Sequence, residues 1–473
     1  MHTTKLGLLI TTSTLTICQQ VAAAEAQVAS TKPGTDFHYT WRSGVLPSSS
    51  GSANESDSPS ATRLKSAVSE FDVAPLTVIN AMDEALLRSP RAAAIRSTLG
   101  ITQANYAYAT VQRNSYFFFD RGLVAEAVRR IGPAMTWTPP WQTAFDFLVA
   151  KRQVDQSKLE ILRDLWQLRS DTRRAYTDLV IAQETSKATA NLVYLGQQTY
   201  TVAQRRFAAG AVPEFDVIKG KVILEQAELD QKLADQRVIK ARQYLNLLLG
   251  RPPKQAIAVV NFAPSAPNTS RGRSYLLPDF EESLPDIDAF LTQARTYRWE
   301  LMIVAQQMKV NRANLENAYA TILPVPQLVL GGSTSGNQPT GPKLNATFFT
   351  VNAELPITNM QQGDIAKYRA TTKQLNWQLG AVKNQVNIEV SAAYNDLLTY
   401  RERIKLYQNS LLADSEEAAR LARRSYEVGH SDITGLIQAQ QSNFQTQLQY
   451  LADVQSYQQA FVDLEKSVGR PLQ

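Results

Sequence analysis

Apolar residues recur at alternating spacings of four and three in two segments of the chain, which is the heptad pattern of a coiled-coil seam. The first seam consists of Ile161, Leu165, Leu168, Thr172, Ala175, Leu179 and Ala182, and the second of Tyr450, Val454, Tyr457, Phe461, Leu464 and Val468. Most other positions in these segments are polar. The pattern therefore predicts long helices that contact water on two sides, which suits either a soluble coiled coil or the wall of a water-filled helical tube.

Two long stretches without proline delimit the principal helices. Residues 144–209 contain one glycine, Gly196, and predict a helix about 100 Å long at about 1.5 Å per residue. Residues 365–428 form the second such stretch, and Gly380 is the one glycine within it. The next glycines, Gly210 and Gly429, are expected to end the two helices, because glycine readily adopts the left-handed conformation of a helix cap.

Helices of about half this length complete the pattern. Residues 214–249 and 433–468 predict helices that return from the two glycine turns, and another half-length helix is expected to begin near Leu76 and near Asp286. Two half-length helices placed end to end match one long helix. The lengths therefore predict a tall antiparallel bundle, and a fold class that is mainly α with a small β part.

The chain contains an internal repeat. Residues 203–252 align without a gap on residues 422–471 after a shift of 219 positions. The matched identities include Ala203 with Ala422, Arg205 with Arg424, Gly210 with Gly429, Ile218 with Ile437, Gln226 with Gln445 and Leu245 with Leu464. Both copies close on Gly-Arg-Pro. Residues 73–250 and 286–473 are therefore predicted to be tandem structural repeats, joined by the Pro-rich segment 251–285.

Each repeat has a candidate β-hairpin between its first helix and its long helix. In the second repeat the strands are expected at residues 324–330 and 344–356, and in the first at residues 115–119 and 131–138, although residues 124–130 also fit a helix. The last strand alternates apolar residues with polar ones, as expected for one lipid-facing and one lumen-facing side. Its apolar residues are Phe349, Val351, Ala353 and Leu355, and its polar residues are Thr350, Asn352 and Glu354.

Strand counting predicts an assembly. Beyond the N-terminal segment there is no run of 18 or more apolar residues, so no transmembrane helix is predicted. A chain that crosses a bilayer without such a helix needs a closed β-barrel. Two hairpins supply only four strands, whereas the smallest barrels need about eight. A membrane role therefore requires that several chains share one barrel.

The N-terminus has the order of a secretory signal peptide. Lys5 precedes a short apolar run and then the small residues 22–24, which predicts a signal peptide over residues 1–24 and export of the chain. The alternative, a lipid-modified Cys18, is disfavoured because the preceding residue, Ile17, is not small. Residues 25–72 are rich in Ser, Thr, Pro and Gly, and such a segment buries too little apolar surface to order itself. We expect a flexible leader.

Composition and charge weigh against enzymes and nucleic-acid binders. Hydrophobic residues make up 44% and charged residues 19% of the chain, and basic residues exceed acidic ones by six without any dense basic run. The chain has one cysteine, so an intramolecular disulfide is impossible. Its three histidines, His2, His38 and His430, stand in no nucleophile–base–acid set or paired metal spacing. We expect no catalytic residues, no cofactor and no metal site.

The two turns resemble the signature of the TolC-like outer-membrane efflux family. The residues that carry the resemblance are Arg206-Phe207-Ala208-Ala209-Gly210 with Phe215-Asp216-Val217-Ile218, and Ser425-Tyr426-Glu427-Val428-Gly429 with Leu436-Ile437-Gln438-Ala439. The ends of the two repeats, residues 247–252 and 466–471, and the segment Glu354-Leu355-Pro356-Ile357 are similar as well. Each motif alone is weak, but their order, duplication and spacing over residues 73–473 make the resemblance specific.

The resemblance implies a homotrimer with a twelve-stranded β-barrel in outer-membrane lipid and a periplasmic tunnel of twelve helices. It implies a passive exit duct of a tripartite efflux system, in which a periplasmic adaptor (membrane fusion) protein connects the channel to an inner-membrane transporter that pumps small molecules. In the family the two turns form the tip where the adaptor docks. Here that tip comprises Gly210, Ala211, Val212, Pro213, Glu214, Phe215, Asp216, Gly429, His430, Ser431, Asp432, Ile433, Thr434 and Gly435.

The periplasmic entrance departs from the family pattern. Well-known members carry two acidic residues one turn apart after the second turn, which form an anionic ring. The corresponding positions here are Gly435 and Gln438. Asp216 and Asp432 are the other acids that we expect near the entrance.

Two alternatives remain open from the sequence. A type I protein-secretion channel would have the same fold and the same turns, and the genes beside this one would separate it from an efflux channel. A periplasmic coiled-coil scaffold belongs to another class, and it would have no need of the alternating strand that ends at Leu355.

Overall fold

A computed structural model describes residues 76–472, except 110, 112–113, 122–128, 137–138, 261–275, 278–279, 281–282, 336–343 and 354–355. The fold is that of the unit Phe71–Gln473. The predicted signal peptide and leader, with Cys18, lie outside the described residues, as does Leu355 of the predicted last strand.

The two long helices are confirmed. Helix α5 spans Pro140–Ala208, 69 residues, and Gly196 lies within it. The second long helix runs as α9 (Gln362–Leu406), a π-helical turn η1 (Tyr407–Leu411) and α10 (Leu412–Val428). The π-helical turn was not anticipated, because nothing in the apolar spacing of the sequence marks it.

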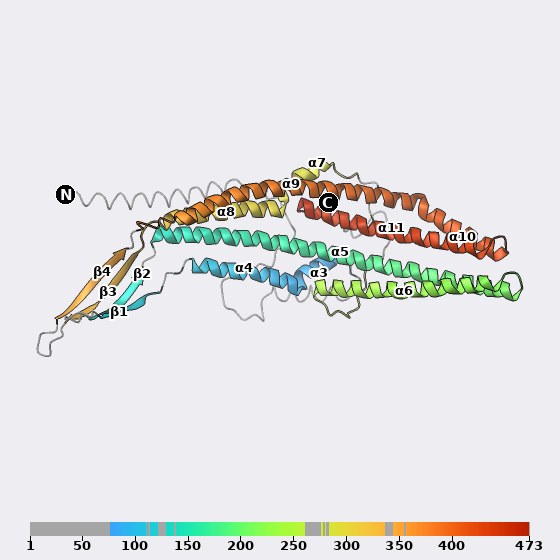
Figure 1. The fold of residues 1–473 in the computed structure, drawn as a ribbon, viewed down its shortest axis with the longest axis horizontal. Helices are drawn as coiled ribbons and strands as arrows, with labels where there is room; N and C mark the ends of the chain where they lie inside the picture. The colour runs from blue at the N-terminus through green and yellow to red at the C-terminus, as the bar shows by residue number, and fades with distance from the viewer. Residues whose placement is uncertain are drawn as a thin grey trace. The chain divides into compact units, whose positions relative to one another are not determined.

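The returning helices are also confirmed. Helix α6 spans Glu214–Leu249 and α11 spans Ile433–Val468, with 36 residues each. The backbone at Gly210 and Gly429 has φ of 70° and 89°, the left-handed conformation expected at these turns. In Figure 1 both turns lie at the end of the helices that is remote from the β-strands.

The expectation of a single half-length helix at the start of each repeat was wrong. The first repeat begins with α3 (Val78–Arg88) and α4 (Pro90–Tyr108), and the second with α7 (Ile287–Tyr297) and α8 (Trp299–Ala320). One extended residue, Ser89 or Arg298, separates the helices of each pair. At Ser89 the break follows from Pro90, since a residue before proline disfavours the helical conformation.

The helices form one layer in which short helices are stacked end to end beside the long ones. Helices α4 and α6 pack along one side of α5, α8 and α11 pack along its other side, and α9 packs against both α8 and α11 (Figure 1). One apolar core lies between α3, α5 and α6, and a second lies between α7, α9 and α11. A third apolar cluster lies between the two turns. Both predicted seams lie in these contacts: Leu168, Thr172 and Leu179 are buried on α5, and Val454 and Leu464 on α11.

The strands form a single antiparallel sheet in the order β1-β2-β3-β4. Strand β1 spans Tyr116–Arg121, β2 Arg129–Thr136, β3 Pro326–Ser335 and β4 Leu344–Ala353. Both hairpins were predicted, but β3 continues five residues beyond its expected end. Arg129 and Arg130, which also fitted a helix in the sequence, belong to β2. Among the described residues, no helix combines the length and the apolar character that a membrane span requires.

Candidate functional site

The sheet presents one apolar face. Successive residues of a strand point to opposite faces, and directly paired residues share a face. The register pairs Phe119 with Ile131 and Leu330 with Phe349. The register places a group of exposed apolar side chains on one face, which we call the apolar sheet face. These residues are Phe117, Phe119, Ile131, Leu330, Phe349 and Val351. Their side chains are between 47% and 69% exposed. Ala353 is exposed on the same face, as the alternation in the sequence predicted for this strand.

The first turn at the other end of the helices is closed by two backbone hydrogen bonds. The N–H of Gly210 donates to the Phe207 carbonyl at 2.8 Å, and the N–H of Ala211 donates to the Arg206 carbonyl at 2.8 Å. This is the Schellman arrangement, which satisfies carbonyls that a helix end leaves without partners. Helix α6 then begins with Glu214 and Asp216 in its first turn, where carboxylates interact favourably with the helix dipole.

The second turn repeats this arrangement and adds a side-chain cap. The N–H groups of Gly429 and His430 donate to the carbonyls of Tyr426 and Ser425 at 3.1 and 2.9 Å. Helix α11 starts after Asp432, whose carboxylate accepts a hydrogen bond from the Gly435 N–H at 3.1 Å. That hydrogen bond is the main cause of the lowered pKa of Asp432, and Lys219 lowers it further.

Side chains connect the two turns. The Arg206 guanidinium of α5 donates to the Tyr426 carbonyl of α10 at 2.7 Å and lies 4.7 Å from the centre of the Tyr426 ring. Lys219 of α6 donates to Thr434 of α11 at 2.8 Å. We call these two contacts the inter-repeat links. A basic residue of the first repeat thus holds the second repeat in each link.

An apolar cluster lies behind the inter-repeat links. It consists of Ala203, Tyr426, Ile433, Leu436 and Ile437, and Val202 and Val217 pack against it. Tyr426 is only 1% exposed, and burial, followed by the charge of Asp216, raises the pKa of its hydroxyl. Of the predicted tip residues, Ile433 is 1% exposed and belongs to this core, whereas Phe215 is 65% exposed.

The remaining predicted tip residues are arranged around that core. Those exposed to solvent are Gly210, Ala211, Pro213, Glu214, Gly429, His430, Asp432, Thr434 and Gly435, and those half-buried are Val212, Asp216 and Ser431. Gln438 is exposed on α11, one turn beyond Gly435. The fold therefore brings Asp216, Asp432, Gly435 and Gln438 to one end of the helices, where the basic residues of the inter-repeat links accompany the two acids.

Sequence reasoning missed the residues that form the inter-repeat links. Arg206 and Tyr426 were part of the family motif, but neither was assigned a role, and Lys219 was not singled out. A weak signal existed for Arg206. The repeat alignment places Ser425 opposite it, so the first repeat has a long cationic side chain where the second has a short one. The contact itself depends on how α5 packs beside α10, which no spacing within one helix reveals.

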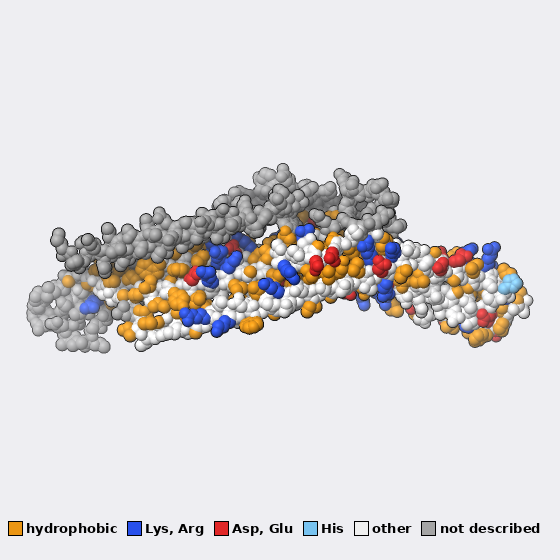
Figure 2. Space-filling view, turned by 90° about the horizontal axis from the view of Figure 1, so that it is seen from above, with side chains coloured by type: hydrophobic (Ala, Val, Ile, Leu, Met, Phe, Trp, Pro, Cys, Tyr) orange, Lys and Arg blue, Asp and Glu red, His pale blue; other side chains and the backbone are white. Residues whose placement is uncertain are grey.

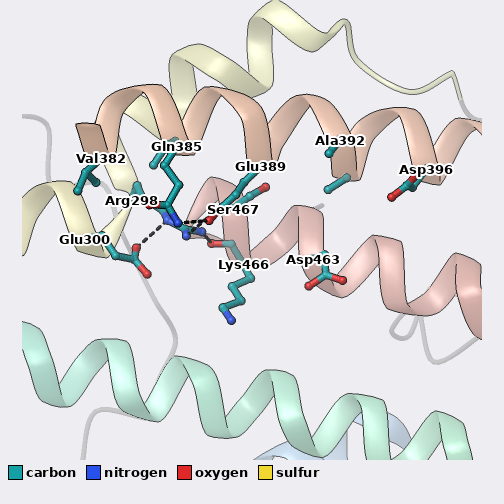
Figure 3. Close-up of a pocket in the computed structure, with 12 residues that line it drawn as sticks. Arg298, Glu300, Val382, Gln385, Glu389, Ala392, Asp396, Asp463, Lys466 and Ser467 are labelled. Atoms are coloured by element: carbon teal, nitrogen blue, oxygen red, sulfur yellow. Dashed lines mark hydrogen bonds and ion pairs between the residues drawn. The ribbon is translucent and has the colours of Figure 1, made fainter. Parts of the chain in front are cut away.

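A pocket of about 510 Å³ lies where α8 and α11 meet end to end, with α9 along one side. Figure 3 shows Arg298 among the residues that line it, with dashed lines to the groups that it contacts. The Arg298 guanidinium contacts Glu300 and Glu389 at 2.6 Å each and donates to the Lys466 carbonyl at the end of α11. A cation at a helix C-terminus interacts favourably with the helix dipole. The charges of this pocket therefore join three helices.

Acidic and basic side chains are interspersed among apolar and uncharged ones on the face seen in Figure 2. Within the described part of the chain, no group of three or more His, Cys, Asp or Glu side chains is placed to bind a metal ion.

Comparisons with known proteins agree with this architecture. Residues 291–470 match the model of the outer membrane efflux protein family. The cobalt-zinc-cadmium resistance protein CzcC of Cupriavidus metallidurans is 23% identical over 321 residues, which are 67% of this chain and 71% of that protein. Nodulation protein T of Rhizobium leguminosarum bv. trifolii is 24% identical over 334 residues, which are 68% of this chain and 65% of that protein. Residues 291–470 therefore carry an outer membrane efflux protein domain, and the chain as a whole is similar to TolC-like outer membrane efflux proteins.

Solved structures show the same fold. The outer membrane protein VceC from Vibrio cholerae is similar with a TM-score of 0.65 at 14% identity, and the match covers 84% of this chain and 97% of that chain. The outer membrane efflux protein match supports the bacterial outer membrane as the location and efflux transport as the process. The apolar sheet face and the connected turns lie at opposite ends of this fold.

Proposed function

We propose that three copies of this chain form an outer-membrane channel that serves as the passive exit duct of a tripartite efflux system. The observation that carries this proposal is that the protomer has two pairs of unpartnered edges, one pair in its sheet and one pair in its helical layer. The trimeric count comes from the family resemblance.

The sheet edges are the first support. Strands β1 and β4 each have one partner, so one side of each strand offers unpaired backbone groups. Four strands are too few to close on themselves, since closed barrels need about eight. Pairing of β1 with β4 of the next copy leaves no free edge. It also continues the apolar sheet face around the ring, with the opposite face toward the lumen.

The helical edges are the second support. Helix α6 carries a line of exposed apolar side chains that faces away from α5: Phe215, Ile218, Val222, Leu229, Leu233, Tyr244 and Leu247. We call this line the α6 stripe. At the other edge of the layer, exposed apolar residues of α9 and α10 include Trp377, Ile388, Leu406, Leu421 and Val428. Apolar area of this extent on an elongated layer is typical of a subunit contact.

Both pairs of edges require the same kind of contact. Edge α6 differs from edge α9–α10, and β1 differs from β4, so each contact joins unlike surfaces head to tail. Such heterologous contacts form closed rings when the rotation between copies closes. One rotation then closes the sheet into a barrel and the helices into a tunnel.

The turns are the proposed docking site of the periplasmic adaptor. They lie at the end of the helices remote from the sheet, and Phe215 and His430 are exposed there. The inner-membrane transporter is the proposed source of energy. The relative CzcC is named for resistance to cobalt, zinc and cadmium, which supports small solutes as the exported class.

The assembly is tested with two neighbouring substitutions on α6. Leu229→Lys places a charge in the α6 stripe, whereas Glu228→Lys places the same side chain on the charged flank of the same helix. We expect the detergent-extracted Glu228→Lys variant to give the mass of a trimer by native mass spectrometry, like the unmodified protein. The Leu229→Lys variant should give mostly monomer, because burial of an unpaired ammonium group costs several kcal/mol. A stable monomer for the unmodified protein contradicts the proposal.

A further inference from the structure

A cationic side chain lies on the sheet face opposite the apolar one. Arg130 of β2 pairs with Ser333 of β3 in the register, whereas its neighbour Ile131 belongs to the apolar sheet face. Alternation along the strand therefore points Arg130 away from that face. Phe348, Thr350 and Asn352 of β4 share the face of Arg130. If the apolar face contacts lipid, as proposed above, Arg130 points into the lumen.

The position of Arg130 along the strand places it far from the helices. It is the second residue of β2, and the opposite end of this strand leads into α5. In Figure 1 strand β2 begins at the end of the sheet that is remote from α5. In the proposed channel the helices are periplasmic, so Arg130 lies toward the outer mouth.

An aromatic platform supports the guanidinium. The Arg130 guanidinium carbon lies 5.9 Å from the centre of the Phe348 ring, within the range of a cation–π contact. Phe348 pairs with Gly331 of β3, and a Cβ at Gly331 would lie 2.9 Å from the ring. Because Gly331 has no side chain, the Phe348 ring can lie over β3, toward Arg130. Arg130 itself remains exposed.

We propose that Arg130, supported by Phe348, favours the passage and binding of anionic solutes at the outer mouth of the channel. The inference rests on the proposed trimeric channel, in which threefold symmetry places three guanidinium groups around one lumen. Like charges that line a narrow passage with low-dielectric walls concentrate counter-ions there. A guanidinium group also binds phosphate and carboxylate oxygens in a bidentate geometry. The solute class is thus small anions that bear phosphate or carboxylate groups.

The test measures ion selectivity in planar bilayers. The trimer is inserted with a KCl gradient at low ionic strength, because salt at about 0.1 M screens charges beyond about 10 Å. We expect Arg130→Gln to lower the ratio of anion to cation permeability at least about threefold. Arg130→Lys retains the charge and should leave this ratio nearly unchanged. Asp120 is the register partner of Arg130 and is present in all three proteins.

Pyrophosphate, added to the chamber on the sheet side, serves as the second probe. It should reduce the conductance of the unmodified channel but not that of Arg130→Gln. Phe348→Leu retains the charge and removes the platform, so it should weaken the pyrophosphate block while the permeability ratio stays close to that of the unmodified protein. If the Arg130→Gln channel has the same permeability ratio and the same pyrophosphate block as the unmodified channel, the inference is wrong. Absence of any channel from the unmodified protein would instead overturn the proposed function.

Discussion

At the scale of single residues, the inter-repeat links decide how firmly the two turns hold together. Arg206 is half-buried between α5 and α10, and its guanidinium also lies 3.3 Å from where a Cβ of Gly429 would be. Any side chain at Gly429 would therefore crowd Arg206, in addition to the strain of φ at 89°. The glycine serves two purposes here: it ends α10 and leaves room for the cation.

Arg206→Ala tests this link. A hydrogen bond from a charged group contributes about 1.5–3 kcal/mol, so its loss should make amide hydrogen exchange at the start of α11 faster by about tenfold or more. The measurement is hydrogen–deuterium exchange with mass spectrometry on the trimer. Arg205→Ala is the matched control, because Arg205 is exposed on the same helix. Equal exchange in the two variants would show that Arg206 does not hold the second turn.

Residue identities at the turns were predictable to different degrees. Gly210 and Gly429 were assigned left-handed conformations because each is the first glycine after a long helical pattern, and glycine commonly caps a helix in this conformation. Ile433 was assigned to the docking surface, yet it is buried, since the cluster that covers it draws on α5, α10 and α11 together. The spacing of apolar residues in the sequence describes one helix at a time, so it does not predict a surface that three helices form together.

At the scale of elements, the π-helical turn η1 distinguishes the second long helix from the first. Tyr407 of η1 donates to Gln449 of α11 at 3.3 Å, and Gln408 donates to Tyr450 of α11 at 3.1 Å. Two consecutive residues thus face the same neighbouring helix. A π-helical turn holds one more residue than the α-helical turn it replaces, and such turns frequently occur at functional sites.

Deletion of one residue tests whether η1 is such an insertion. Removal of Asn409 should convert η1 to α-helix and leave α9 and α10 in their present orientation, so the variant should remain folded and trimeric. Removal of Ala190, the equivalent position in the uninterrupted α5, should rotate the end of α5 by about 100° per residue and misplace Ala203. Thermal unfolding followed by circular dichroism, at equal protein concentration, gives the comparison. A loss of stability as large for Asn409 as for Ala190 would refute this account of η1.

The elements divide by how local their signals are. Both long helices, both returning helices and both hairpins were predictable, because apolar periodicity and glycine or proline positions act within a few residues. The break at Ser89 had a local signal in Pro90 that the length comparison overlooked. The break at Arg298 had none: its extended backbone accompanies contacts with Glu300, Glu389 and the end of α11, which are established only in the folded layer.

At the scale of the whole molecule, the duplicated unit yields surfaces that differ between copies of the repeat. The first repeat supplies the α6 stripe and the basic residues of the inter-repeat links, and the second supplies the opposite edge and the carbonyl and hydroxyl groups that accept from those residues. Both repeats have the same order across the layer, the returning helix first and the long helix next, so the two outer edges are unlike. That order is what gives the proposed ring one direction.

The charge at the periplasmic end follows from this arrangement. Asp432 accepts a hydrogen bond from Gly435, and the charge of Lys219 contributes to its lowered pKa. Asp216 and Arg206 both act on the hydroxyl of Tyr426, the acid raising its pKa and the base lowering it. Two acids near the entrance are thus accompanied by two bases. Gly435 and Gln438, at the level of the family's acidic ring, carry no charge.

We therefore expect weak block by a trivalent cation at the entrance. La³⁺, added to the turn side of channels in planar bilayers, should reduce the conductance of the unmodified protein only slightly. The double substitution Gly435→Asp with Gln438→Asp places six carboxylates around a threefold axis and should increase the apparent affinity for La³⁺ by about tenfold or more, because a narrow passage concentrates the potential. Gly435→Ala with Gln438→Asn is the matched control, since it changes the same positions without charge and should behave like the unmodified protein. Tight block of the unmodified channel would mean that Asp216 and Asp432 remain available to cations in spite of Arg206 and Lys219, and Asp432→Asn would then relieve it.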